Sequence, residues 1–188
     1  MPESPQESPL PFRAPVTVEL LLASPRSRYV GRPADGAAPA SGTELHDRVE
    51  VRAGLGIVGD RYFNAPAHRT ASVTLFAAEQ LERVARELGT DLLDPAATRR
   101  NVVLRGLDVD GLRGAVLSLD CGDGPVRFAV HRPASPCAWM DVEVAPGAFR
   151  ALRGSGGVRC SPLDDGVLRT GPDEARATVP IGPPARAR

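Results

Sequence analysis

The sequence predicts a single domain that is mainly β with a few helices, of the α+β class, whose strands form a barrel or a sandwich. Three observations carry this prediction. Short runs of β-branched and alternating apolar residues recur along the chain, turn signals separate them at close intervals, and only one segment has clear helical periodicity. The length of 188 residues suits one domain with tails.

The predicted strands follow one another with little between them. They cover residues 16–23, 47–52, 70–76, 100–106, 115–120, 126–130, 157–163 and 166–170. Asp-Gly pairs at 110–111, 123–124 and 165–166, and Arg-Gly at 113–114, supply turns between several of these runs. Many short strands with such spacing are typical of barrels and sandwiches.

One helix is predicted over residues 75–89. Leu81, Val84 and Leu88 share a face at helical spacing, Thr74 is suited to cap the start, and Gly89 is suited to end it. A second, shorter helix is expected over 147–153. Both are expected to pack on the barrel without taking part in chemistry.

Both ends of the chain are expected to be loose. Residues 1–15 are rich in Pro, Ser and Glu, and 172–188 have a similar character, so the folded domain is predicted to span 16–171. The first residues lack the cationic start and apolar region of a signal peptide, and no run of about 18 apolar residues occurs. We therefore expect a cytoplasmic protein with no membrane partner.

Composition argues against nucleic-acid binding. The formal net charge is zero, no lysine occurs, and all basic residues are arginines without a dense basic run. One Trp and two Tyr leave few rings for base stacking. The arginines are planar donors suited to carboxylates and phosphates.

A glycine-rich loop raises the possibility of dinucleotide binding. Gly54, Gly56 and Gly59 have the G-x-G-x-x-G spacing, but Asn and Pro follow where a helix would have to begin. The expected element is a strand–loop–strand, so we reject a dinucleotide fold. Asp60 is expected to hold the loop through backbone amides, whereas Arg61 either projects to an anion or pairs with an acid.

Cys137 is the main candidate for chemistry. It ends a loop stiffened by Pro133 and Pro136, where Arg132 and His131 are near enough in sequence to favour a thiolate. A thiolate is a metal ligand and a nucleophile; the alternative is a small buried apolar residue. We assign Cys121 and Cys160 to that alternative, and three cysteines do not indicate a disulfide framework.

A third candidate group is Arg99, Arg100 and Asn101 at the start of a strand. Adjacent residues of a strand face opposite ways, so only one of the two arginines is expected to reach a given pocket. Asn101 offers donors and acceptors to a heterocycle or to its own turn.

These stretches together resemble the MOSC domain, the C-terminal domain of molybdenum-cofactor sulfurases, in a stand-alone bacterial-type form. The similar segments are "GIVGDR", "RTASVTLFAAEQL", "RRNVVLRGLDV", the Pro136-Cys137 pair and "GGVRCSPLDDGVLRTG". They occur in the family's order and cover most of 16–171.

The resemblance implies a barrel-like MOSC fold and a molybdenum–molybdopterin cofactor, or sulfur transfer linked to it. It implies that Cys137 ligates molybdenum and is the catalytic residue. It also implies that Arg100 and Asn101, with Arg99, hold the cofactor's phosphate and pterin, and that Asp60 and Arg61 line the same face. Pyridoxal phosphate binding is a further association of the family.

Three functions are open at this point. One is an oxidoreductase that removes oxygen from an N-hydroxylated small molecule, with electrons from a separate ferredoxin or flavoprotein reductase. Another is a sulfur carrier that takes a persulfide on Cys137 from a cysteine desulfurase. The last is a cofactor-binding module without catalysis.

Overall fold

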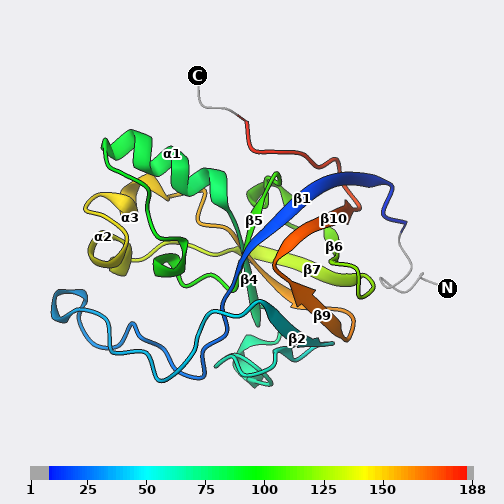
Figure 1. The fold of residues 1–188 in the computed structure, drawn as a ribbon, viewed down its shortest axis with the longest axis horizontal. Coiled ribbons are helices and arrows are strands. Elements are labelled where there is room, and N and C mark those ends of the chain that lie inside the picture. The colour runs from blue at the N-terminus through cyan, green and yellow to red at the C-terminus, as the bar shows by residue number, and fades with distance from the viewer. Residues whose placement is uncertain (1–8, 186–188) are drawn as a thin grey trace.

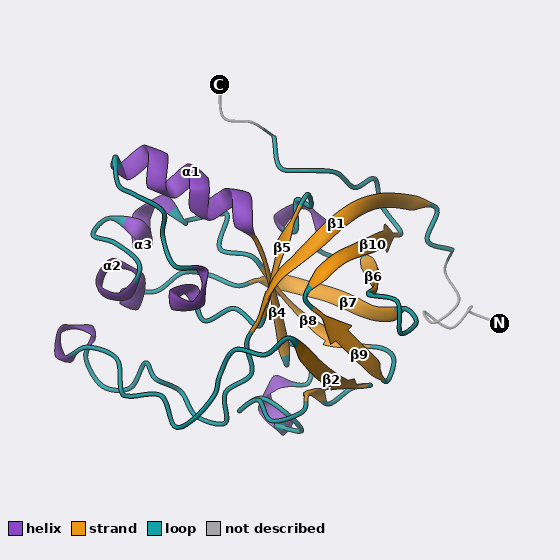
Figure 2. Ribbon diagram, viewed as in Figure 1, coloured by secondary structure: helices purple, strands orange, loops and turns teal. Residues whose placement is uncertain are grey.

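The computed structural model describes residues 9–185, which form a closed seven-stranded barrel with three helices gathered on one side (Figures 1 and 2). The predicted α+β barrel is therefore confirmed. Residues 1–8 and 186–188, the outermost parts of the two predicted tails, lie outside the described residues.

The barrel is built from neighbours that are mostly antiparallel. Its order is β1 (Phe12–Leu21), β10 (Gly171–Ala177), β6 (Val116–Asp120), β7 (Val126–Pro133), β8 (Val158–Pro162), β4 (Val73–Ala77) and β5 (Val102–Arg105), which returns to β1. Only the β4–β5 pair is parallel, and α1 (Ala78–Leu88) forms part of the connection between these two strands. A second small sheet has the order β3 (Gly56–Ile57), β2 (Arg48–Arg52) and β9 (Gly166–Arg169).

Two apolar cores lie on opposite sides of the barrel wall. Along β4, Val73 and Leu75 point into the barrel, whereas Phe76 packs outward with the helices. The outer core joins α1, α2 (Trp139–Glu143) and α3 (Ala148–Ala151) to the wall. All five residues of β4 are buried because both of its faces are covered.

The long helix agrees with its prediction except at its start. Gly89 ends α1 in the left-handed conformation, at φ 63°. Thr74 does not cap it, since Ala77 occupies the N-cap position and Thr74 lies within β4. Four short 3-10 helices complete the described chain: η1 (Pro33–Asp35), η2 (Pro66–His68), η3 (Pro95–Thr98) and η4 (Asp110–Leu112).

The predicted limits of the folded region, 16 and 171, were too narrow at both ends. Strand β1 begins at Phe12. Strand β10 includes the first residues of the predicted C-terminal tail, and it pairs with β1 on one side and β6 on the other. In β10 the buried positions are Asp173, Ala175 and Ala177, with charged residues between them. The two alanines gave little strand signal in the sequence because they are small, but they fit the barrel interior.

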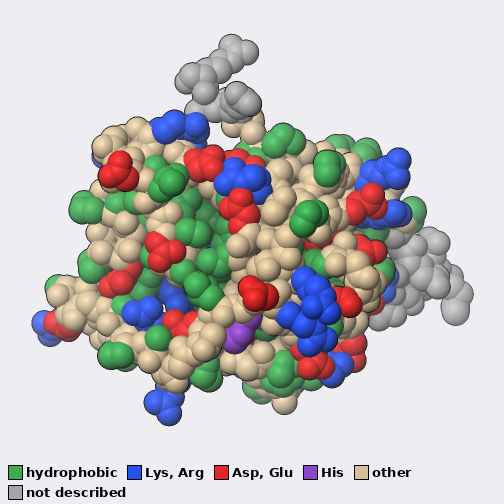
Figure 3. All heavy atoms as spheres, in the orientation of Figure 1, with side chains coloured by type: hydrophobic (Ala, Val, Ile, Leu, Met, Phe, Trp, Pro, Cys, Tyr) green, Lys and Arg blue, Asp and Glu red, His purple; other side chains and the backbone are tan. Residues whose placement is uncertain are grey.

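The surface has no broad region of one charge on the face shown in Figure 3, where acidic and basic side chains are interspersed. None of the helices within residues 9–185 has the length and apolar character needed to cross a membrane.

Candidate functional site

All the predicted site residues except Cys137 meet on the outer side of the barrel wall, where β8, β4 and β5 lie side by side. A small polar recess there is lined by Asp60, Arg61, Tyr62, Thr74, Arg99, Arg100, Asn101 and Arg159. It brings together five of the six predicted residues, from the glycine loop and from the Arg-Arg-Asn segment.

Asn101 is the structural centre of this recess. Its Oδ1 accepts hydrogen bonds from the Thr74 amide at 3.0 Å and from the Thr74 hydroxyl at 2.8 Å. Its Nδ2 donates to the Leu22 carbonyl at 3.0 Å and to Asp60 Oδ2 at 3.1 Å. Every hydrogen-bonding group of this buried amide is engaged by the protein, so its role is to join β1, β4 and the glycine loop.

Asp60 has the loop-holding role expected from the sequence. Its two oxygens accept from the amides of Tyr62 at 3.0 Å and Ser24 at 3.2 Å, in addition to Asn101. The preceding Gly59 has φ 86°, which glycine adopts without strain. The loop passes to η2 and then β4, so the rejection of a dinucleotide fold is confirmed.

Arg99 and Arg100 both line the recess, so the expectation that only one could do so was wrong. Arg99 is not in a strand: it ends η3 with φ 57°, and side-chain alternation does not apply to it. Its guanidinium forms two hydrogen bonds with Glu44, at 2.8 and 2.9 Å. Both side chains are buried, 6% and 9% exposed, and Arg99 Nε has no partner among residues 9–185.

Arg61 and Arg159 complete the cationic lining. Arg61 lies over the ring of Tyr62, 4.6 Å from its centroid. Arg159 extends from the outer side of β8, directly opposite Thr74 in the sheet register. Within the described chain neither guanidinium has a carboxylate within ion-pair distance. The recess therefore offers arginine donors to an anion.

Arg100 connects the recess to the cysteine loop. It donates to the carbonyls of Gly156 at 2.9 Å and Ala134 at 2.7 Å. Burial, and to a lesser extent Arg159, lowers the pKa of Arg100 to about 10, although Cys137 and Asp110 act in the opposite direction. Arg100 thus remains charged near neutral pH, within electrostatic range of Cys137, and supports the loop that carries it.

A pair of glycines lets the cysteine loop approach the barrel closely. A Cβ on Gly156 would lie 2.5 Å from the Ala134 carbonyl oxygen, and one on Gly157 only 2.2 Å from that of Leu75. The Gly157 carbonyl also accepts the Ala134 amide at 2.8 Å. Backbone contact, rather than side-chain packing, sets the position of this part of the loop.

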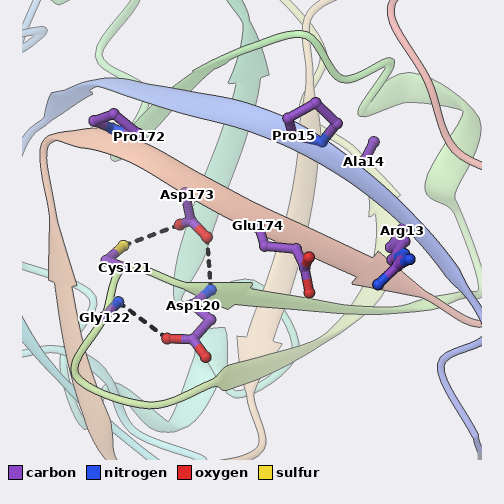
Figure 4. Close-up of a pocket in the computed structure, with 9 residues that line it drawn as sticks. All are labelled: Arg13, Ala14, Pro15, Asp120, Cys121, Gly122, Pro172, Asp173 and Glu174. Atoms are coloured by element: carbon purple, nitrogen blue, oxygen red, sulfur yellow. Dashed lines mark hydrogen bonds between the residues drawn. The ribbon is translucent and has the colours of Figure 1, made fainter.

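Cys137 is exposed, whereas the other two thiols are held in unreactive surroundings. Burial raises the pKa of Cys160 far above its usual range. Burial also raises the pKa of Cys121 to about 12. Figure 4 shows Cys121 in a cleft of about 560 Å³, where its thiol donates to Asp173 Oδ2 at 2.9 Å. That cleft lies between the β6–β7 turn, β1 and β10, so it is a different site from the recess.

Sequence reasoning missed several residues that build the site. Arg159 directly follows "GGV" in a motif that the resemblance includes, and this position was the available signal. Nothing in the sequence indicated Glu44 or Tyr29, because both come from the irregular segment between β1 and β2. His131 Nε2 lies 2.8 Å from Ser161 Oγ, so this ring nitrogen has a partner on β8.

Asp110 supports the same glycine pair and makes stability depend on pH. Its Oδ1 accepts from Gly157 at 2.9 Å, and burial raises its pKa to about 6. The folded state then binds the proton more tightly than the unfolded state, so this contribution to stability is full below about pH 4 and is lost as pH rises through 6.

We expect Asp110→Asn to be more stable than the wild type at pH 7.5 by about 1 kcal/mol, and equal to it near pH 4. This magnitude is based on roughly 1.4 kcal/mol for each unit by which the pKa is raised, and it is reduced because the Asp110 side chain is partly exposed to solvent. Urea denaturation at the two pH values measures it. A difference that did not change with pH would contradict the proposed burial of the charge.

Among residues 9–185, no three His, Cys, Asp or Glu side chains lie together in a way that could hold a metal ion. Any metal at Cys137 would therefore need most of its ligands from a non-protein group. A pterin dithiolene would supply such ligands, and arginine guanidiniums are donors of the kind that a phosphate group binds.

Comparison with solved structures shows the same fold. The YuaD protein from Bacillus subtilis superposes with a TM-score of 0.67 and 19% identity, over 88% of this chain and 96% of that one. YiiM from Escherichia coli gives 0.51 and 18%, over 94% and 72%. YiiM from Geobacillus stearothermophilus gives 0.55 and 14%, over 91% and 76%.

No curated protein matches the chain significantly. The family comparison is more informative. The sequence profile of the MOSC domain matches residues 59–173, which include the end of the glycine loop from Gly59 to Arg61, the Arg-Arg-Asn segment, Cys137 and Arg159. The chain belongs to the MOSC domain family, which is associated with molybdenum-cofactor-related proteins.

Proposed function

We propose that this protein binds a molybdenum–molybdopterin cofactor, with Cys137 as the protein ligand to molybdenum and the arginine recess as the site of the cofactor's phosphate. The observation that carries the proposal is the buried, unpartnered Nε of Arg99 beside two guanidiniums without acidic partners. A buried donor without a partner is costly, and an anion bound in the recess would balance the positive charge that the arginines bring there.

The residues divide into those that would touch the cofactor and those that support them. Arg61, Arg99 and Arg159 have donors for a phosphate, and Cys137 offers an exposed thiol to the metal. Asn101 and Asp60 are supporting residues, because their polar atoms are already used within the protein. This division differs from the role in pterin binding that the family resemblance implied for Asn101.

The proposed reaction is the removal of oxygen from an N-hydroxylated or related small molecule. The metal would supply the two-electron chemistry when bound. The chain's own contribution would be to hold the cofactor's anion, to present Cys137 on a stiff loop, and to keep a cationic surface beside it. Electrons would come from a separate ferredoxin or flavoprotein reductase.

The exposure of Cys137 also favours a second candidate, a sulfur carrier. An accessible thiol at the end of a proline-framed loop can attack the outer sulfur of a cysteine desulfurase's persulfide, which releases the desulfurase cysteine as a thiol. The persulfide formed on Cys137 can then be presented to a metal–sulfur centre. Pyridoxal phosphate binding has no support, because the chain has no lysine to form the imine that this cofactor requires.

The test is to express the protein in a host that makes molybdenum cofactor and to measure molybdenum and released pterin per chain. We expect near-stoichiometric amounts in the wild type. We expect Cys137→Ser to lose the metal, and Arg159→Gln to lose more than half of the pterin. Reductase assays with an N-hydroxylated base then separate an enzyme from a binding module.

Two matched variants control for general damage. Cys121→Ser keeps a donor toward Asp173, and Arg13→Gln removes an exposed arginine at the other cleft. Both should retain metal and pterin. A wild-type protein without either would refute the cofactor proposal, and a trapped persulfide on Cys137 would favour the sulfur carrier.

A further inference from the structure

Tyr29 reaches the site from the long segment that links β1 and β2. Its ring stacks on Trp139, with centroids 4.9 Å apart and planes 5° from parallel. Trp139 is buried and begins α2, two residues after Cys137. The position of Tyr29 is therefore coupled to the end of the cysteine loop.

The hydroxyl of Tyr29 makes a second connection, to the other half of the site. It donates to the carbonyl of Ala97 in η3, two residues before Arg99. Burial, and to a lesser extent the nearby Glu143 carboxylate, raises the pKa of Tyr29 to about 12. The hydroxyl therefore keeps its proton at neutral pH. Arg99 and Cys137 have smaller electrostatic effects on the pKa of this hydroxyl, and these two effects are opposite in sign.

The segment that carries Tyr29 is itself fixed at several points. Ser24 and Glu44 lie near the two ends of the segment, and Ser24 Oγ donates to the Glu44 carboxylate at 2.6 Å. The Ala37 amide donates to Glu143 on α2 at 2.9 Å, and Arg28 Nε donates to the Ala38 carbonyl at 2.8 Å. These contacts hold Tyr29 in place rather than leave it on a free loop.

We infer that Tyr29 is a positioning residue that fixes the separation between Cys137 and the arginine recess. The inference rests on the proposed function, because a single ligand that contacts both a thiol and an anion pocket requires a constant distance between them. Tyr29, like Arg100, contacts both halves: its ring packs against Trp139 on the cysteine side, and its hydroxyl donates to Ala97 on the arginine side.

The experiment compares how fast Cys137 of cofactor-free protein reacts with iodoacetate, an anion, and with neutral iodoacetamide. The ratio of the two rates cancels thiolate fraction and general access, and it reports positive charge beside the sulfur. Peptide mass spectrometry assigns the reaction to Cys137. We expect a wild-type ratio above that of a neutral cysteine peptide, and a fall of about threefold in Tyr29→Leu.

Trp139 is the single tryptophan, so its fluorescence reports whether the stack has been lost. Tyr29→Phe keeps the ring and loses the hydroxyl, and should give an intermediate ratio. Val30→Ala, at a neighbouring position that is 63% exposed, should keep the wild-type ratio and emission.

Two outcomes would overturn the inference. One is a Tyr29→Leu protein that keeps the wild-type ratio although its Trp139 emission has changed. The other is a Tyr29→Leu protein whose Trp139 emission does not change. If Tyr29→Leu does not fold, a wild-type ratio in Tyr29→Phe overturns it. The measurement needs no cofactor, so absence of molybdenum together with a lowered ratio would refute the proposed function and leave the role of Tyr29 standing.

Discussion

Gly157→Ala is expected to lower the free energy of unfolding by more than about 4 kcal/mol, the largest effect of any single substitution considered for this chain. The added Cβ would lie 2.2 Å from the Leu75 carbonyl oxygen, and Leu75 pairs with Val158 in the barrel. The Gly157 amide and carbonyl are bound to Asp110 and Ala134, so neither side can move away freely.

Gly154→Ala is the matched control. Gly154 has φ 80°, close to the 86° of Gly157, but no heavy atom lies within 4 Å of its added Cβ. It should cost only about 1 kcal/mol, the strain of a left-handed alanine. Urea denaturation of both variants measures the difference. Equal losses would mean that backbone conformation, and not close approach, requires glycine at 157.

Asn101→Ala is expected to destabilise the protein by about 3–5 kcal/mol. It removes the single oxygen that accepts from both the Thr74 amide and the Thr74 hydroxyl, although this hydroxyl still accepts from the Asn101 backbone amide. It also leaves the Leu22 carbonyl and one Asp60 oxygen without the side-chain amide donor. Each buried polar group left unsatisfied costs about 1–3 kcal/mol, and the terms are not additive. The fraction of cofactor lost by Asn101→Ala should therefore equal the fraction of the protein that is unfolded.

Asn64→Ala is the control, because within residues 9–185 the Asn64 side chain makes only an exposed hydrogen bond, with Arg69 at 2.9 Å. Asn64 has φ 54°, so the substitution should cost about 1 kcal/mol, mostly from the strain of a left-handed alanine. Denaturation and pterin content are measured on the same samples. An Asn101→Ala protein as stable as the wild type but free of pterin would show that Asn101 contacts the cofactor directly.

The fold was predictable where side chains alternate strongly. The runs at 47–52 and 115–120 coincide with β2 and β6, because Val and Leu at every second position mark a strand with one buried side. Strand β10 was missed because its inward residues are two alanines and an aspartate, which carry little apolar signal. Closure of the barrel gives them their burial.

The sequence predicted which residues lie together at the recess better than it predicted what each of them contacts. Sequence motifs selected Asp60, Arg61 and the Arg-Arg-Asn segment, and the structure brings them to one recess. They did not indicate that Arg99 pairs with Glu44, since these residues are 55 positions apart and the contact depends on how η3 meets the β1–β2 segment.

The sequence by itself determined the α+β class, the absence of a dinucleotide fold and the family, and it supplied the prediction that Cys137 is the functional cysteine. These depend on local periodicity, on turn chemistry and on motifs in order. The tertiary structure alone decided that both adjacent arginines share one recess, that Asn101 is a buried support, and that Tyr29 joins the two halves of the site. Those properties arise from contacts between distant segments, which local sequence patterns do not encode.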